Sequence, residues 1–319
     1  MFKNYIVGID LGGTKINTVL SNLKGDVVSQ YTISTDAFKG EEVVLERIMI
    51  TINKVLDIKD ISIEEVMAIG IGSPGPLDSK KGIIITTPNL PFKNFNIVNP
   101  IFKKYSVPTY LDNDANVAAI GEFLFGAGKG TNNMIYVTVS TGIGGGGILN
   151  GKLYRGSTYN ALEIGHMTVE PNGAKCNCGN YGCAEALASG TAIGRQGREA
   201  VDKGEITSLS NYENITSYEV FKEGKNGDKI AQDIIKKSLN YLGICIANLV
   251  TSFDPEMIVI GGGVTKAGDI VFNSVKEVVN KRCFKVMAES CEIVPPKLGV
   301  DAGVMGAVAL ALTEEGIEF

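Results

Sequence analysis

Hydrophobic positions along the chain follow two periodicities, short apolar runs and spacings of three and four residues. The runs predict strands, and the wider spacing predicts amphipathic helices. The strands are expected at residues 5–10, 16–21, 67–71 and 107–111, and the helices at residues 43–56 and 115–125. Because strands alternate with helices and polar residues collect at the strand ends, the pattern indicates an α/β fold.

The pattern restarts in the second half of the chain. A strand at residues 134–139 leads into the glycine-rich segment 140–147, as the first strand leads into Gly12-Gly13-Thr14. A third version of this strand and glycine turn is expected at residues 257–263, and helices are expected at residues 230–249 and 301–312. The sequence therefore predicts an internal repeat at the scale of a domain. The polar segment 204–227 is expected to be an irregular surface excursion.

Composition places the chain among ordinary soluble proteins. It has 319 residues, of which 44% are hydrophobic and 20% charged, and its net charge is −5. The acidic balance argues against a nucleic-acid surface, which needs a basic face. Neither a signal-peptide core nor an apolar run of membrane-spanning length is found, so we expect a cytoplasmic protein without membrane contact.

Three cysteines and the only histidine form a candidate metal site. Cys176, Cys178 and Cys183 fall within eight residues, and His166 lies ten residues upstream. This set suits a closed, structural zinc site, with Gly179 and Gly182 letting the loop fold back. The alternative is a glycine-rich loop with ordinary thiols and a histidine that only packs.

Glutamates flank both halves of this zinc motif. Glu163 lies three residues before His166, and Glu185 lies two residues after Cys183. A zinc ion there would cross-link two carboxylates that are distant in sequence. We therefore expect the metal to shape a pocket and to take no part in the chemistry.

The glycine turns are candidate phosphate sites. Around the first turn, Asp10, Thr14 and Lys15 supply a carboxylate, a hydroxyl and an ammonium beside exposed amides, a set that suits Mg²⁺ and phosphate. Neither a Walker A sequence nor a dinucleotide-binding Gly-x-Gly-x-x-Gly motif is present. Tight hairpins that need glycine for steric reasons alone are the alternative.

Asp114 is the candidate general base. It lies in Asp112-Asn113-Asp114-Ala115-Asn116, where a strand ends and a helix begins. A carboxylate there can accept the proton of an alcohol that attacks phosphorus. Asp is also a preferred helix N-cap, so spacing alone leaves both roles open.

Together these motifs resemble the ROK group (repressors, open reading frames and kinases), and within it the bacterial ATP-dependent glucokinases. The resemblance covers nearly the whole chain. It is carried by the segments 10–15, 113–116, 138–146, 163–166, 176–185 and 260–264. The zinc and glutamate signature is the most specific part.

The resemblance implies an actin-like ATPase fold of the hexokinase and ribonuclease H-like type, with the active site in a cleft between two α/β domains. Residues 1–125 with 302–319 would form the small domain, and residues 126–301 the large domain with the zinc site. It makes Asp114 the catalytic base that deprotonates a sugar 6-hydroxyl. The implied sugar contacts are Gly75, Asn89, Asn113, Asp114, Glu163, His166 and Glu185. The implied zinc ligands are His166, Cys176, Cys178 and Cys183. The implied metal, phosphate and nucleoside contacts are Asp10, Gly12, Gly13, Thr14, Lys15, Thr141, Gly142 and Gly262.

The resulting expectation is a kinase that uses ATP, Mg²⁺ and a structural Zn²⁺ to convert a hexose, first of all glucose, to its 6-phosphate. N-acetylmannosamine, fructose and allose are alternative substrates, and polyphosphate is an alternative donor. Phe92 replaces a tryptophan that is common in relatives, and Ser140 and Leu162 are two further departures. A sugar-sensing repressor is a rival, but little chain precedes Asp10 to hold a DNA-binding helix-turn-helix. A non-catalytic sugar-binding protein would leave Asp114 unexplained. A homo-oligomer is the general expectation for such enzymes.

Overall fold

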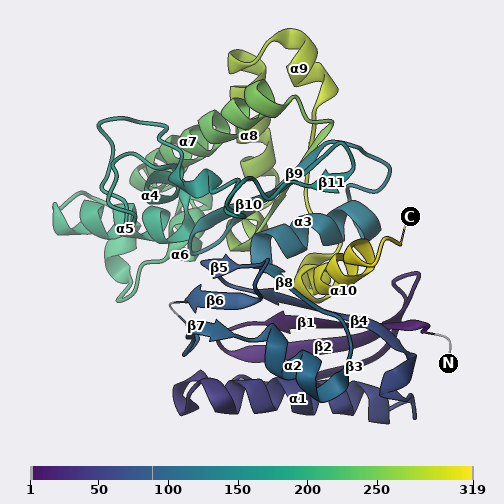
Figure 1. The fold of residues 1–319 in the computed structure, drawn as a ribbon. Helices are drawn as coiled ribbons and strands as arrows, with labels where there is room; N and C mark the ends of the chain where they lie inside the picture. Colours follow the sequence, from purple (N-terminus) through teal and green to yellow (C-terminus); the bar gives the residue numbers. More distant parts are fainter. Residues whose placement is uncertain (1–2, 88, 318–319) are drawn as a thin grey trace.

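Two five-stranded sheets with the same strand arrangement form the framework of the protein (Figure 1). The computed structural model describes residues 3–87 and 89–317, so the outermost residues of the expected small domain lie outside the described residues. The first sheet has the order β3-β2-β1-β4-β8, with β1 (Tyr5–Leu11), β2 (Lys15–Asn22), β3 (Val27–Ser34), β4 (Val66–Ser73) and β8 (Thr109–Asn113). The second has the order β11-β10-β9-β12-β13, with β9 (Met134–Val139), β10 (Ile143–Leu149), β11 (Lys152–Leu153), β12 (Met257–Gly261) and β13 (Glu292–Val294).

The strand directions confirm the internal repeat. In each sheet the first three strands form an antiparallel meander, and two parallel strands extend it on the other side. The expectation of a third strand and glycine turn of the same kind was wrong. β12 runs parallel to β9 and continues into the 3₁₀ helix η5 (Gly263–Ala267), which makes it the counterpart of β4.

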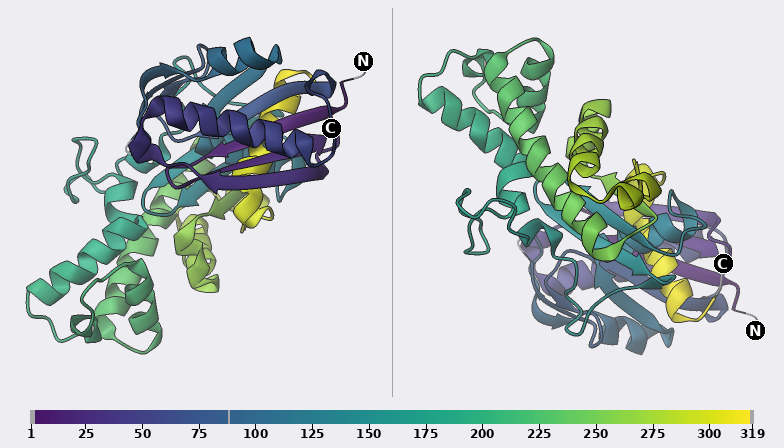
Figure 2. Two further views of the ribbon diagram at one scale, coloured as in Figure 1. Left: turned by 90° about the horizontal axis from the view of Figure 1, so that it is seen from below. Right: turned by 90° about the horizontal axis from the view of Figure 1, so that it is seen from above.

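Helices lie on both faces of each sheet, and two of them fill the space between the sheets (Figure 1). α1 (Glu41–Asp57) packs on β2 and β3, and α2 (Val98–Tyr105) on β8. α3 (Asp114–Phe125) packs on β9 and β10, and α10 (Ala302–Glu314) on β1 and β4. The other helices are α4 (Ala184–Ala188), α5 (Gly190–Asp202), α6 (Ser217–Lys225), α7 (Lys229–Phe253), α8 (Asp269–Arg282) and α9 (Lys285–Ser290). Figure 2 shows α5 and α6 projecting away from the two sheets.

The remaining elements are short. Three strands form a small antiparallel sheet beside the first, namely β5 (Leu77–Asp78), β6 (Ile83–Thr86) and β7 (Lys93–Asn96). The other 3₁₀ helices are η1 (Ala37–Lys39), η2 (Ile63–Glu65), η3 (Ile164–His166), η4 (Ser208–Asn211) and η6 (Gly299–Asp301). Within the described residues, no helix has the length and apolar character that a membrane crossing needs.

The Ala- and Gly-rich C-terminal helix α10 makes unusually close contacts. A Cβ atom on Gly306 would lie 2.0 Å from the carbonyl oxygen of Val117 on α3. A Cβ atom on Gly70 of β4 would lie 1.9 Å from the carbonyl oxygen of Ala307. Real side chains do not tolerate such distances. The composition of this helix therefore follows from its position between α3 and the first sheet.

A buried carboxylate holds both chain segments that connect the two sheets. Glu122 of α3 is fully buried, and its two oxygens accept the backbone N–H groups of Ala127 (2.8 Å), Lys297 (3.0 Å) and Leu298 (2.8 Å). Ala127 lies between α3 and β9, and the other two lie between β13 and α10. The single side chain thereby fixes both connections to the same helix, and it satisfies three buried donors.

The segment 204–227 is ordered, so the expectation of an irregular excursion was wrong. It contains η4 and α6, and α6 begins with a capping box in which the Thr216 N–H donates to the Glu219 carboxylate at 2.8 Å. The carboxylates of Glu223 and Asp228 accept hydrogen bonds from Ser208 at 2.7 and 2.9 Å. Polar residues that looked like loop composition are caps and tethers, and apolar periodicity alone does not reveal them.

Candidate active site

The four predicted metal ligands lie together beside β10. The Nδ1 and Sγ atoms of His166, Cys176, Cys178 and Cys183 all fall within 4.8 Å of one another. The Cys178 and Cys183 sulfurs are 3.6 Å apart, and His166 Nδ1 is 3.7 Å from the Cys176 sulfur. Tetrahedral zinc with bonds of about 2.3 Å to sulfur separates its ligands by about 3.8 Å, so the donor set and its spacing fit this ion.

The local chain explains how these ligands meet. The Cys176 N–H donates to the Asn180 carbonyl at 2.8 Å, which closes a tight loop, and Gly179 has a positive φ of 97°. Gly182 has a φ of 69°, and a Cβ atom there would lie 1.5 Å from the Glu170 carbonyl oxygen. Only glycine fits this position. The fold-back that the two glycines predict is therefore present.

Both flanking glutamates lie on the short helices that carry residues of the predicted metal site. Glu163 is the N-cap residue of η3, which ends at His166, and Cys183 is the N-cap residue of α4, whose first turn carries Glu185. Glu185 Oε2 accepts the N–H of Ile143, at the start of β10, at 3.0 Å. A bound zinc would thus fix the two carboxylates relative to each other and to the second glycine turn.

Asp114 is the first residue of α3, and the N-cap is Asn113. The Asn113 side chain accepts the Ala115 N–H at 2.9 Å, so capping does not account for Asp114. Solvent reaches the Asp114 side chain, yet protein surrounds it on most sides. This desolvation raises the pKa of Asp114 to about 6; the negative charges of Asp10 and Glu163 add to the rise, and a hydrogen bond from Ala115 opposes it. A carboxylate with such a pKa suits general base catalysis near neutral pH.

The other predicted sugar contacts lie around the start of α3 and the first glycine turn. A Cβ atom on Gly75 would lie 3.1 Å from the Asn113 side-chain nitrogen, which places the two residues against each other. A Cβ atom on Gly13 would lie 2.7 Å from the carbonyl oxygen of Asn89. Phe92 is buried and stacks on Phe95 with ring centroids 5.0 Å apart. The aromatic departure at residue 92 therefore belongs to the core of the first sheet.

The first glycine turn has free backbone donors beside Asp10. The Gly12 N–H donates to the Lys15 carbonyl at 3.0 Å and so belongs to the hairpin itself. The N–H groups of Gly13 and Thr14 have no acceptor among the described residues. Burial raises the pKa of Asp10, and the positive charge of Lys15 partly offsets this rise. The Asp10 carboxylate packs against Gly303 of α10. Within the described chain no group donates a hydrogen bond to this carboxylate, so it is available to a cation such as Mg²⁺.

The second glycine turn repeats this arrangement. The Ser140 N–H donates to the Gly142 carbonyl at 2.8 Å, and the N–H groups of Thr141 and Gly142 meet no acceptor in the part of the chain that the structure describes. The four glycines that follow lie in β10, and two of them are needed for packing. Cβ atoms would clash with α3 at Gly146 (2.8 Å) and with Ile164 at Gly145 (2.5 Å). Within the segment 138–147, only the turn at residues 140–142 therefore remains a candidate phosphate site.

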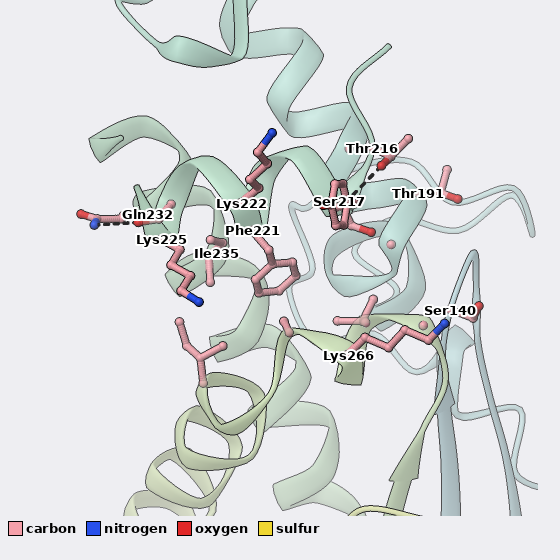
Figure 3. A pocket seen from close by; sticks show the side chains of 18 of the residues that line it. Ser140, Thr191, Thr216, Ser217, Phe221, Lys222, Lys225, Gln232, Ile235 and Lys266 are labelled. Carbon is pink, nitrogen blue, oxygen red and sulfur yellow. Dashed lines mark hydrogen bonds between the residues drawn. The ribbon is translucent and has the colours of Figure 1, made fainter. Parts of the chain in front are cut away.

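A cavity of about 1220 Å³ opens next to the second turn, between α5, α6 and η5 (Figure 3). Ser140, Thr141 and Gly263 line its inner end, and a Cβ atom on Gly262 would lie 2.4 Å from the Val139 carbonyl oxygen, so the second and third turns are adjacent. The cavity lining includes the basic residues Arg198, Lys222, Lys225, Lys236 and Lys266, and no acidic residue among those described. This lining suits a polyanionic ligand such as a nucleotide.

Sequence reasoning missed most of this cavity. Figure 3 shows Phe221 pointing from α6 towards η5, Lys266 running towards Ser140, and Lys222 pointing the other way. The Lys222 ammonium lies 5.4 Å from the centroid of the Tyr212 ring. The capping box at Thr216 was the signal that could have revealed α6. The cavity does not include Asp114, Glu163 or Glu185, so these predicted sugar contacts lie outside it.

Comparisons with known proteins agree with this geometry. The ROK family model matches residues 6–314. The chain is 36% identical to a glucokinase from Halalkalibacterium halodurans, over 99% of this chain and 97% of the glucokinase. It is 32% identical to a xylose repressor from Caldicellulosiruptor bescii, over 97% of this chain and 78% of the repressor.

The fold is also similar to solved structures of ROK kinases. A ROK hexokinase from Thermus thermophilus has a TM-score of 0.86 and 33% identity, over 98% of this chain and 99% of the hexokinase. A ROK glucokinase from Streptomyces griseus in complex with glucose and AMPPNP has a TM-score of 0.76 and 29% identity, over 97% and 99% of the two chains. With its actin-like fold of two α/β units, the chain therefore belongs to the ROK family.

Proposed function

We propose that this protein is an ATP-dependent hexose kinase that phosphorylates the 6-hydroxyl of glucose. The observation that carries the proposal is Asp114, a carboxylate with a raised pKa at the first turn of α3, close enough to Asp10 and Glu163 for their charges to affect it. The relatives include sugar kinases, and the similar Streptomyces griseus glucokinase was solved with glucose and an ATP analogue.

In the proposed mechanism, the sugar lies between the start of α3 and the metal centre. Glu163 and Glu185 accept hydrogen bonds from neighbouring hydroxyls, and Asn113 and the backbone of Gly75 contact the ring from the other side. His166 offers its Nε2 to the sugar, because Nδ1 faces the thiols. An epimer would leave one of these groups unpaired, which costs about 1–3 kcal/mol.

Asp114 then takes the proton of the sugar 6-hydroxyl as the hydroxyl oxygen attacks the γ-phosphorus of ATP. The bond between the γ-phosphorus and the β–γ bridging oxygen breaks, and ADP leaves with that oxygen. The N–H groups of Gly13, Thr14, Thr141 and Gly142 are the donors that we assign to the phosphate oxygens. Mg²⁺, when bound through Asp10, would neutralise phosphate charge. The nucleoside would occupy the cavity between α6 and η5, beyond Gly262.

The relatives also suggest alternatives for the substrate, the donor and the function. One similar structure is that of a putative N-acetylmannosamine kinase, and one with a similar fold is that of an inorganic polyphosphate/ATP-glucomannokinase. The xylose repressors favour a second candidate, a protein that binds a sugar without turnover. A sugar-binding regulator needs the metal centre and Glu163, and has no use for a base such as Asp114.

The test is ADP release from Mg-ATP by zinc-loaded protein with glucose, N-acetylmannosamine, fructose, mannose and allose in parallel, and with polyphosphate as a second donor. Turnover that is fastest with glucose supports the proposal. Turnover with another hexose alone keeps the mechanism and overturns the substrate. Sugar binding without ADP release, measured by calorimetry, favours the regulator.

A further inference from the structure

Arg155 joins three distant parts of the chain next to the proposed sugar site. It follows β11, and its guanidinium lies between two carboxylates (Nε to Asp112 Oδ2, 2.6 Å; Nη2 to Glu314 Oε1, 2.7 Å). Asp112 is the penultimate residue of β8, and Glu314 is the last residue of α10. The Asp112 side chain is 1% exposed and that of Arg155 is 22% exposed, so the pair is largely shielded from water. Removing one partner of such a pair leaves the other charge shielded from water without a counter-ion, so loss of Arg155 should disturb the surroundings of Asp112.

Asp112 connects this ion pair to the proposed base. Its other oxygen, Oδ1, accepts the Asn113 N–H at 2.8 Å and the Asn116 side-chain nitrogen at 2.9 Å. Asn113 is the N-cap of α3, and Asp114 is the next residue. The orientation of the first turn of α3 therefore depends on an aspartate whose second oxygen is held by Arg155.

The backbone of Arg155 connects the same ion pair to the other side of the sugar. The Ala161 N–H donates to the Arg155 carbonyl at 3.1 Å, which closes the loop 155–161. Glu163 follows two residues later as the N-cap of η3. Leu162, between them, has a φ of 63°, a conformation that side chains other than glycine rarely adopt. The loop therefore reaches Glu163 by a fixed path that starts at Arg155.

We propose that Arg155 is a positioning residue, which sets the distance between the base Asp114 and the sugar-binding Glu163 by pairing with Asp112. This inference rests on the proposed function. Arg155 contacts no group assigned to the substrate. Its effect reaches the sugar through Asp112 on one side and through its own loop on the other. The donor cavity and both glycine turns lie outside this network. Loss of Arg155 should therefore weaken hexose binding and turnover, and should leave ATP binding unchanged.

The test compares Arg155→Met and Arg155→Lys with the matched control Arg47→Met. Arg47 is 24% exposed and binds the Ser34 carbonyl at 2.6 Å, so its loss removes a similar contact far from Asp112. We expect Arg155→Met to raise the KM for the hexose and to lower kcat, so that kcat/KM for the hexose falls by about 10–100-fold. The KM for ATP should stay within about twofold of wild type. Arg155→Lys keeps one charged contact and should recover part of the loss.

Zinc content and melting temperature establish that each variant is folded, and calorimetry gives hexose affinity independently of turnover. Arg155→Met with normal hexose KM, kcat and affinity would overturn the inference. Equal increases in both KM values, or an equal defect in Arg47→Met, would also overturn it, because each indicates a general loss of structure. Failure of the wild-type protein to phosphorylate any hexose is a different result, which refutes the proposed function itself.

Discussion

Replacing Asp114 by Asn tests both the assigned base and the physical cause of its pKa. Asn has nearly the same shape and cannot accept a proton from the sugar. Loss of a general base typically lowers kcat by about 10²–10⁴-fold, and we expect hexose affinity to be largely retained. The proposed base must be ionised to accept a proton, so wild-type kcat is expected to fall as pH falls through about 6.

The same substitution should stabilise the fold at neutral pH. A carboxyl whose pKa rises from 3.8 unfolded to about 6 folded binds its proton more tightly in the folded state. Folding is then penalised above pH 6, where the folded group is charged, and the penalty fades as pH falls towards the unfolded value. The full change would be equivalent to about 3 kcal/mol. Because solvent reaches the side chain, we expect a gain of about 1 kcal/mol.

The assay is thermal unfolding of zinc-loaded wild type and Asp114→Asn at pH 8 and pH 5, together with coupled ADP release. The melting temperature of the variant should be higher at pH 8, and the difference should shrink at pH 5. Asp57→Asn, an exposed aspartate at the end of α1, is the control and should change stability by less than about 0.5 kcal/mol. Near-normal turnover would refute the base, and lower stability at pH 8 would refute the desolvation argument.

Three further predictions concern the framework of the site. Glu122→Gln should lower the free energy of unfolding by about 2–4 kcal/mol in urea unfolding, because an amide cannot accept all three backbone N–H groups. The control Glu292→Gln, at an exposed position, should have little effect in the same assay. Gly146→Ala should push α3 away from β10 and cost about 1–3 kcal/mol, whereas Gly144→Ala, with its nearest neighbour at 3.3 Å, should be tolerated better in thermal unfolding. Zinc chelation, or Cys178→Ser, should lower the melting temperature and weaken hexose binding more than ATP binding in calorimetry. Unchanged hexose affinity in metal-free protein would contradict the role assigned to zinc.

Local signals in the sequence were sufficient for the parts of the fold with short-range causes. The strand and glycine turn at residues 5–14 recurs at residues 134–142, and this predicted the repeat that the two sheets share. The cysteine spacing, with Gly179 and Gly182, predicted a loop that folds back on itself. These features depend on backbone conformations that one residue type favours, so they can be read without knowing the tertiary structure.

Long-range packing accounts for what the sequence did not reveal. The glycines of β10 looked like a phosphate loop because their real cause, contact with α3 on one face and with Ile164 on the other, is tertiary. Similarly, spacing alone left Asp114 open to the roles of helix cap and base, and the structure gives the N-cap position to Asn113. Arg155 and Glu122 belong to no sequence motif, because important partners of each lie more than 100 residues away in the chain. Arg155 pairs with Glu314, and Glu122 accepts hydrogen bonds from Lys297 and Leu298.

These two residues give α3 a double role. At its start, α3 carries Asp114 and is oriented through Asp112 and Arg155; near its end, Glu122 holds both connections between the sheets. A rotation of one sheet relative to the other would have to move these connections around α3, the helix that also carries the proposed base Asp114. If the protein closes on the sugar by such a rotation, Asp114 would therefore move in the same step as the two sheets. Scattering radii measured with and without hexose test this coupling: equal radii would exclude the rotation, and a smaller radius that Glu122→Gln abolishes would support it.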